Sequence, residues 1–168
     1  MKKLVNRFII RLYKFSWVKQ RWGANFNSFQ VSGDPFAPAP KNLKDIHLAV
    51  VSTAGTHHID DHPFDMENLD GDASFRTFSV KSPQSDLMIT HNYYDHSSAR
   101  KDINVVLPLS AIQKAIKEKK IKSTSADVYS FMGHIQNKPL EELIINSIPQ
   151  LIKRLKADKV TAVLVSPA

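Results

Sequence analysis

The sequence predicts a single α/β domain with an open, mostly parallel sheet and flanking helices, of a Rossmann-like kind. Short apolar runs without polar alternation are typical of strands that are buried on both faces of a parallel sheet. Stretches with helical periodicity lie between these runs, and alternating strands and helices favour this fold class. With 168 residues and 42% hydrophobic content, the chain can bury one core of ordinary size.

Residues 1–22 predict a basic amphipathic helix. Leu4, Phe8, Leu12 and Phe15 recur at spacings of three or four residues, as on one face of a helix. Such a helix packs its apolar face on its own domain or on a partner, or it lies on an anionic membrane surface. This segment has seven basic residues and no acidic ones: Lys2, Lys3, Arg7, Arg11, Lys14, Lys19 and Arg21.

The rest of the chain is electrically balanced. Of the 23 lysine and arginine residues, 16 lie outside this helix, and they equal the 16 acidic residues in number. The net charge of +7 therefore belongs to the N-terminal segment, and the balance disfavours a domain that binds nucleic acid. The longest apolar run of the segment, Phe8 to Ile10, is too short for a signal peptide or a membrane span, so we expect a cytoplasmic protein.

Residues 23–42 predict a linker, because Pro35, Pro38 and Pro40 exclude regular structure. The domain then occupies residues 43–168. Its predicted strands are 46–52, 86–90 and 160–165, each an apolar run followed by small or polar residues. The periodicity predicts helices over 108–119 and 139–156, and Pro149 kinks or divides the second one because proline lacks a backbone donor.

Polar clusters follow the first two predicted strands, at residues 52–58 and 91–96. Ligand sites of α/β sheets lie at the carboxyl ends of their strands. The connection between the clusters is long for a simple link, and connections of this length are usually functional or disordered.

The first cluster allows several interpretations. The residues His57, His58, Asp60, Asp61 and His62 have metal-binding side chains, but their spacing fits no helical metal motif, and we predict surface loop residues and no metal. Ser52 lacks the glycine-flanked elbow of a serine hydrolase. The backbone of Thr53 to Gly55 can cradle an anion, although a single glycine is a weak signal.

In the second cluster, His91 and Asp95 form a candidate pair for proton transfer, since a carboxylate can orient an imidazole. A structural hydrogen bond is the alternative interpretation. Asp102 and Asn104 stand before an apolar run and have the chemistry of a turn. The chain contains no cysteine, so it can form neither a disulfide nor a thiolate nucleophile.

The order and spacing of short motifs from about Leu43 to Ala168 resemble the selenoprotein B family of the glycine/betaine/sarcosine/D-proline reductases. In that family, a strand resembling residues 162–168 leads into a selenocysteine or cysteine, and here the sequence stops at that point. The resemblance implies a reading frame terminated at a selenocysteine codon, while a fragment or a degenerate paralogue remain alternatives. The motifs are Val51-Ser52-Thr53-Ala54-Gly55 with His57, Pro63-Phe64-Asp65, Gly71-Asp72, Ser74-Phe75-Arg76, His91 with Tyr94-Asp95, Asp102 with Asn104-Val105-Val106, Pro108-Leu109 and Ser130-Phe131-Met132-Gly133.

The resemblance implies an oxidoreductase subunit that cleaves a bond between an α carbon and nitrogen reductively, with a dithiol as electron source. A selenolate suits this reaction because it is ionised at neutral pH and strongly nucleophilic. The implied partners are other reductase subunits, one of them with a pyruvoyl group, a thioredoxin-like dithiol donor and a small-molecule substrate. We expect supporting catalytic roles for His57, His91 and Asp95, and substrate binding by Thr53, Gly55, Asp72, Arg76, Tyr94 and Asn104.

A non-catalytic module that binds a small anion or a partner subunit is the alternative, and a metal-dependent hydrolase that uses residues 57–62 is a third hypothesis. An in-frame TGA codon followed by a cysteine codon favours the enzyme over the module, and elemental analysis without metal eliminates the hydrolase. If further strands follow Ala168, the last strand lacks a neighbour and the protein aggregates readily. We expect the chain as given to be inactive and the sheet to be incomplete at its C-terminal side.

Overall fold

The computed structural model describes residues 15–17, 20–21, 37–38, 40–91 and 94–167. The chain divides into two compact units, one with residues 39–91 and 96–168 and the other with residues 1–38 and 92–95. The predicted N-terminal helix and linker lie mostly outside the described residues. The fold below is that of the first unit.

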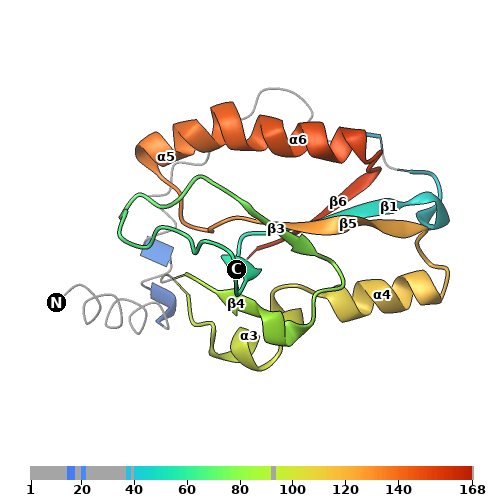
Figure 1. Cartoon of the computed structure of the whole chain (residues 1–168), viewed down its shortest axis with the longest axis horizontal. Coiled ribbons are helices and arrows are strands. Elements are labelled where there is room, and N and C mark those ends of the chain that lie inside the picture. Colours follow the sequence, from blue (N-terminus) through green and yellow to red (C-terminus); the bar gives the residue numbers. More distant parts are fainter. Residues whose placement is uncertain (1–14, 18–19, 22–36, 39, 92–93, 168) are drawn as a thin grey trace. The chain divides into compact units, whose positions relative to one another are not determined.

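A four-stranded mixed sheet forms the centre of this unit, in the order β3-β5-β1-β6 (Figure 1). β1 (His47–Ser52), β5 (Ser123–Ser130) and β6 (Ala162–Ser166) are parallel, and β3 (Arg76–Ser79) runs antiparallel to β5. The sequence prediction of an α/β fold with a mostly parallel sheet is confirmed.

Helices cover both faces of this sheet. α5 (Asn137–Glu142), the π-helical turn η4 (Leu143–Ser147) and α6 (Ile148–Ala157) form one rod on one face, while α4 (Leu109–Lys117) lies on the other (Figure 1). Pro149 stands in the first turn of α6, directly after the π-helical turn. The predicted helix over 139–156 is therefore divided just before its proline.

The predicted strand over 86–90 forms β4 (Leu87–Ile89), which lies outside the main sheet. It pairs antiparallel with β2 (Thr56–His58) in a separate two-stranded sheet. This corrects the expectation that the cluster after this strand lies at the edge of the parallel sheet. The difference arises because β4 is only half buried: Ile89 points inward, while Met88 is 41% exposed, as in a one-sided antiparallel strand.

Short helical segments complete the unit. α3 spans Ser97–Lys101, and the 3₁₀ turns η1, η2 and η3 span Leu43–Asp45, Gln84–Asp86 and Ile103–Val105. No helix in the described residues is both long enough and apolar enough to cross a membrane.

One hydrophobic core cluster lies between the sheet and the α5–α6 rod. Val51, Tyr129, Phe131 and Leu151 are buried there, and Phe75 packs against them with Leu143, Ile148 and Leu155. Burial of apolar surface stabilises the fold by about 25 cal/mol per Å². These contacts therefore hold the rod on the sheet. The rod in turn positions the site described next.

Candidate functional site

The carboxyl ends of the three parallel strands form a row of serines. Ser52 of β1 lies in register with Ser130 of β5 on one side and Ser166 of β6 on the other. Ser52 and Ser130 are fully buried. The Ser52 hydroxyl accepts a hydrogen bond from the Ala54 amide at 3.1 Å, while the Ser130 hydroxyl has no partner among the described residues. The row marks the edge where α/β folds bind ligands, and sequence reasoning missed its alignment because β5 was not predicted.

Gly55 turns the chain out of this edge. Its φ of +66° is in the left-handed region, and an added Cβ would lie 2.5 Å from the Thr90 carbonyl oxygen. The Gly55 amide donates to Phe131 O at 2.9 Å, and its carbonyl accepts from the Thr90 amide at 2.9 Å. Both backbone groups therefore join neighbouring segments and are engaged within the fold. Thr53, two residues before Gly55, is half buried.

The predicted catalytic residue His57 is completely buried. Its Nδ1 lies 2.7 Å from the His58 carbonyl oxygen, and its Nε2 lies 2.8 Å from the Thr90 hydroxyl. Since a carbonyl only accepts, Nδ1 donates the first of these hydrogen bonds. This ring connects β2 with the segment after β4, and its predicted catalytic role stays a prediction.

His91 is also buried, with 5% of its surface exposed. Its Nε2 accepts a hydrogen bond from the Gly133 amide at 3.1 Å, which requires an unprotonated nitrogen. Burial, and to a smaller extent the charges of His134 and His96, lower its pKa to about 4. His91 is therefore neutral at pH 7 and cannot donate from Nε2.

The proposed partners of His91 belong to the other compact unit. Tyr94 and Asp95 form part of the unit that contains residues 1–38 and 92–95. The predicted pairing of His91 with Asp95 is therefore not tested by the structure.

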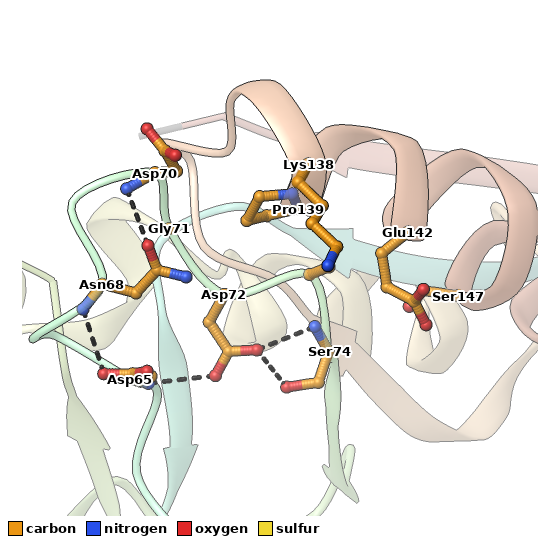
Figure 2. A pocket seen from close by; sticks show the side chains of 11 residues that line it. Asp65, Asn68, Asp70, Gly71, Asp72, Ser74, Lys138, Pro139, Glu142 and Ser147 are labelled. Carbon is orange, nitrogen blue, oxygen red and sulfur yellow. Dashed lines mark hydrogen bonds between the residues drawn. The ribbon is translucent and has the colours of Figure 1, made fainter.

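A cavity of about 550 Å³ lies between the loop at residues 65–74 and the start of the α5–α6 rod (Figure 2). The loop is fixed to the segment after β5: the Gln136 amide donates to Asp70 O at 2.8 Å, and Asn137 Nδ2 donates to Asp70 Oδ1 at 2.9 Å. Because this segment continues from the end of β5, the cavity opens on the carboxyl side of the sheet. Its lining residues are Asp65, Asn68, Asp70, Gly71, Asp72, Ala73, Ser74, Lys138, Pro139, Glu142 and Ser147.

The helical wall of the cavity depends on the π-helical turn. Glu142 precedes η4 and Ser147 ends it, so the five-residue spacing of a π turn places both on one side of the rod. Ser147 is 8% exposed. With Lys138 from α5, this wall presents a carboxylate, a hydroxyl and an ammonium group. Sequence reasoning missed all three residues, because a π-helical turn has no reliable sequence signal.

Asp72 and Arg76 hold the loop of the cavity together. Asp72 accepts from the Asp65 amide at 3.0 Å and from both the amide and the hydroxyl of Ser74. Burial acts to raise the pKa of Asp72, but the hydrogen bonds from Ser74 and Asp65 and the charge of Arg76 lower it below its ordinary value overall. Asp72 therefore remains ionised at neutral pH.

Arg76 uses its guanidinium within the protein. Nε donates to His62 O at 2.7 Å, Nη2 donates to Pro63 O at 3.1 Å, and the group stacks 4.4 Å from the centre of the Phe64 ring. Arg76 does not line the cavity. Of the residues predicted to bind substrate, Asp72 lines the cavity. Arg76 contacts Asp72 from outside the lining.

Asn104 lies outside the cavity lining and caps the first turn of α4. Its side chain donates to Asp102 at 2.8 Å, and its Oδ1 accepts from the Ser110 amide in the first turn of α4 at 2.9 Å. Hydrogen bonds from Asn104 lower the pKa of Asp102. This arrangement is turn and capping chemistry, and the predicted substrate role of Asn104 stays a prediction.

The loop at residues 57–62 forms local contacts. The His58 amide donates to Asp61 at 3.1 Å, and His62 Nδ1 donates to Pro63 O at 2.9 Å. Within the described residues, no group of three histidine, cysteine or acidic side chains has the arrangement of a metal site.

Comparison with known proteins gives a family. Residues 22–167 match the sequence profile of glycine/sarcosine/betaine reductase selenoprotein B. D-proline reductase subunit gamma of Acetoanaerobium sticklandii is 35% identical over 133 residues, which are 78% of this chain and 52% of that subunit. The chain thus spans about half the length of the curated relative it matches. No solved structure shows a significant match. The chain belongs to the glycine/sarcosine/betaine reductase selenoprotein B family.

Proposed function

We propose that this chain is part of a glycine/betaine/sarcosine/D-proline reductase-type oxidoreductase and binds a small amino-acid substrate whose C–N bond is cleaved reductively. The observation that supports it is the cavity on the carboxyl side of the sheet, lined by Asp65, Asp70, Asp72, Glu142 and Lys138. Its excess of carboxylates favours a cationic amine, and it disfavours the small anion of the accessory-module hypothesis.

Within this cavity, Glu142 and Asp70 are the proposed partners of the substrate ammonium group, while Lys138 is the proposed partner of its carboxylate. Asp72 and Arg76 act as positioning residues, because they fix the loop through contacts within the protein. Zwitterion recognition of this kind orients the Cα–N bond without participating in the redox step.

The reaction needs two electrons and two protons. The Cα–N bond breaks, one new C–H and one new N–H bond form, and a dithiol donor is oxidised to a disulfide. We propose that a selenocysteine or cysteine after Ala168 supplies the nucleophile, and that a pyruvoyl group on a partner subunit activates the amine. A residue just after β6 would stand beside the serine row, since Ser166 lies in register with Ser52. A thioredoxin-like protein is the proposed electron donor.

Calorimetric titration with D-proline, glycine, sarcosine and betaine tests the substrate class on the chain itself. We expect binding of at least one of them, and Glu142→Gln weakens it about tenfold through loss of one charge-assisted contact. Glu141→Gln is the matched control, because Glu141 is exposed on the same helix and does not line the cavity. Equal affinities of the two variants would contradict the assignment.

The redox step is tested by DNA sequencing beyond the codon of Ala168 and by assay. An in-frame TGA, with protein translated through it and mixed with partner subunits and a dithiol, should convert D-proline to its ring-opened amino acid. A TAA or TAG codon there, or reduction by the 168-residue chain alone, would overturn this part of the proposal.

A further inference from the structure

β6 is an edge strand with an open side. It pairs with β1 through residues 162–166, and no strand among the described residues pairs with its other edge. That edge presents backbone donors and acceptors that a further strand can use.

Both faces of β6 are apolar and exposed. In register with β1, Val165 lies beside Val51 on the face of the α5–α6 rod, and Leu164 lies beside Val50 on the opposite face. Val163, Leu164 and Val165 are 44%, 36% and 58% exposed, whereas Val50 and Val51 are buried. A strand that is apolar on both faces has the composition of an interior strand of a parallel sheet.

The other edge of the sheet differs. β3 is followed by the exposed Lys81, and a charge of this kind discourages pairing with another chain. β6 contains no charged residue and no proline between Ala162 and Ser166. The protein thus protects one edge of its sheet and leaves the other open to pairing.

The flank of α6 above β6 is apolar as well. Leu151 points into the core, and the Arg154 guanidinium lies 5.3 Å from the Phe75 ring, toward the β3 side. At about 100° per residue, Ile152 projects from the opposite flank to Arg154, which is the β6 side. Ile152 is 43% exposed and extends the apolar surface of Val163 and Val165.

We propose that β6 and this flank of α6 form a docking surface for a parallel strand with a covering helix, supplied by the half of a family-length subunit that lies outside the matched region. The matched region is 52% of the D-proline reductase subunit gamma, so nearly as many residues again belong to that relative. A strand pairs with the open edge of β6, and its connecting helix covers Val165 and Ile152.

A second copy of this chain fits the surface less well. Two β6 edges that pair around a twofold axis satisfy the backbone, but the exposed faces of both strands then lie side by side in the gap between the two rods. A unit that contains both a strand and a helix covers the edge and the faces together, because helices pack on the faces of parallel sheets.

The test is co-expression of this chain with a tagged fragment of D-proline reductase subunit gamma that contains its residues outside the match. We expect a one-to-one complex by affinity purification and light scattering, with hydrogen exchange of residues 162–166 slowed at least ~tenfold relative to the chain alone. Leu164→Lys and Val165→Lys, one on each face, should each abolish the complex.

Ile59→Lys is the control, since Ile59 is 59% exposed in the turn after β2, a strand that does not belong to the sheet of β6. It should leave the complex intact, and circular dichroism should show all three variants folded. Absence of a one-to-one complex overturns the proposal, as does a complex that survives both β6 substitutions. A homodimer that Leu164→Lys dissociates assigns the surface to a second copy instead. The outcome does not depend on the substrate proposal, because no catalytic activity is measured.

Discussion

His91 links protonation to stability. In the folded protein its pKa is lowered to about 4 from an ordinary value of 6.5, mainly by burial, with His134 and His96 facing it. Above pH 6.5 the ring is neutral in both the folded and the unfolded state, so its contribution is constant. Between pH 6.5 and 4, His91 becomes protonated in the unfolded chain but stays neutral in the folded protein. The free energy of unfolding therefore falls as the pH falls.

Replacing His91 by Gln removes this dependence and retains an acceptor for the Gly133 amide. We expect the stability of the wild-type protein relative to His91→Gln to decrease by about 3 kcal/mol from pH 7 to pH 4. Urea unfolding of both proteins at several pH values measures it, and the other histidines cancel in the difference. A difference that is constant over this range would contradict the assigned protonation state.

Gly55 makes a second prediction about a single residue. Its φ of +66° and the 2.5 Å approach of an added Cβ to Thr90 O mean that Gly55→Ala has both backbone strain and a steric clash. We expect a loss of about 2–4 kcal/mol in the free energy of unfolding. Gly133→Ala is the control, since Gly133 is exposed and is not among the glycines with positive φ. Chemical denaturation of the two variants compares them, and equal stabilities would refute the argument.

At the scale of elements, we expect the π-helical turn to depend on Pro149. Pro149 has no amide to donate to a carbonyl one turn earlier, and η4 ends two residues before it. In Pro149→Ala the amide returns, and we expect the rod to become a continuous α-helix in which Glu142 and Ser147 no longer share one side. NMR shifts and amide exchange over residues 143–149 report this change.

The same variant should bind substrate more weakly by calorimetry, while Gln150→Ala, one residue further along the exposed side, should change neither the helix nor the affinity. Persistence of the π pattern in Pro149→Ala would show that packing on the sheet, and not the proline, imposes it. This result would leave the cavity wall intact and separate the helix prediction from the substrate proposal.

Elements with local patterns were predictable, and elements that depend on distant partners were not. β1, β6 and α4 have apolar runs or helical periodicity and lie where the sequence places them. β5 reads STSADVYS, has no apolar run, and changes register with β1 between Leu48 and Val50, so only its two neighbours make it a strand. The chain from 59 to 85 was predicted only as a long connection, and residues 76–79 of it form β3 by pairing with β5.

The candidate site shows the same limit. Asp72 was predicted as a functional residue and lines the cavity. The cavity itself depends on contacts between Asp70 and the segment at Gln136 and Asn137, more than sixty residues away in the sequence, which no local pattern reveals. Motif order is sufficient to identify the family, whereas the cavity wall depends on tertiary packing.

For the molecule as a whole, the excess positive charge is confined to the N-terminal segment. The isoelectric point is about 9.6, and removal of residues 2–22 lowers the formal net charge from +7 to 0. At pH 7 we expect the complete chain to bind a cation exchanger and to elute only with salt, because screening weakens its attraction to the resin. The shortened chain should pass through and should be less soluble near neutral pH, since molecules without net charge repel one another weakly.

A variant of all 168 residues with the seven basic residues changed to glutamine separates the effect of charge from that of length, and it should behave like the shortened chain. Retention of either variant at the salt concentration that elutes the wild-type protein would show that the balanced body presents a basic face of its own.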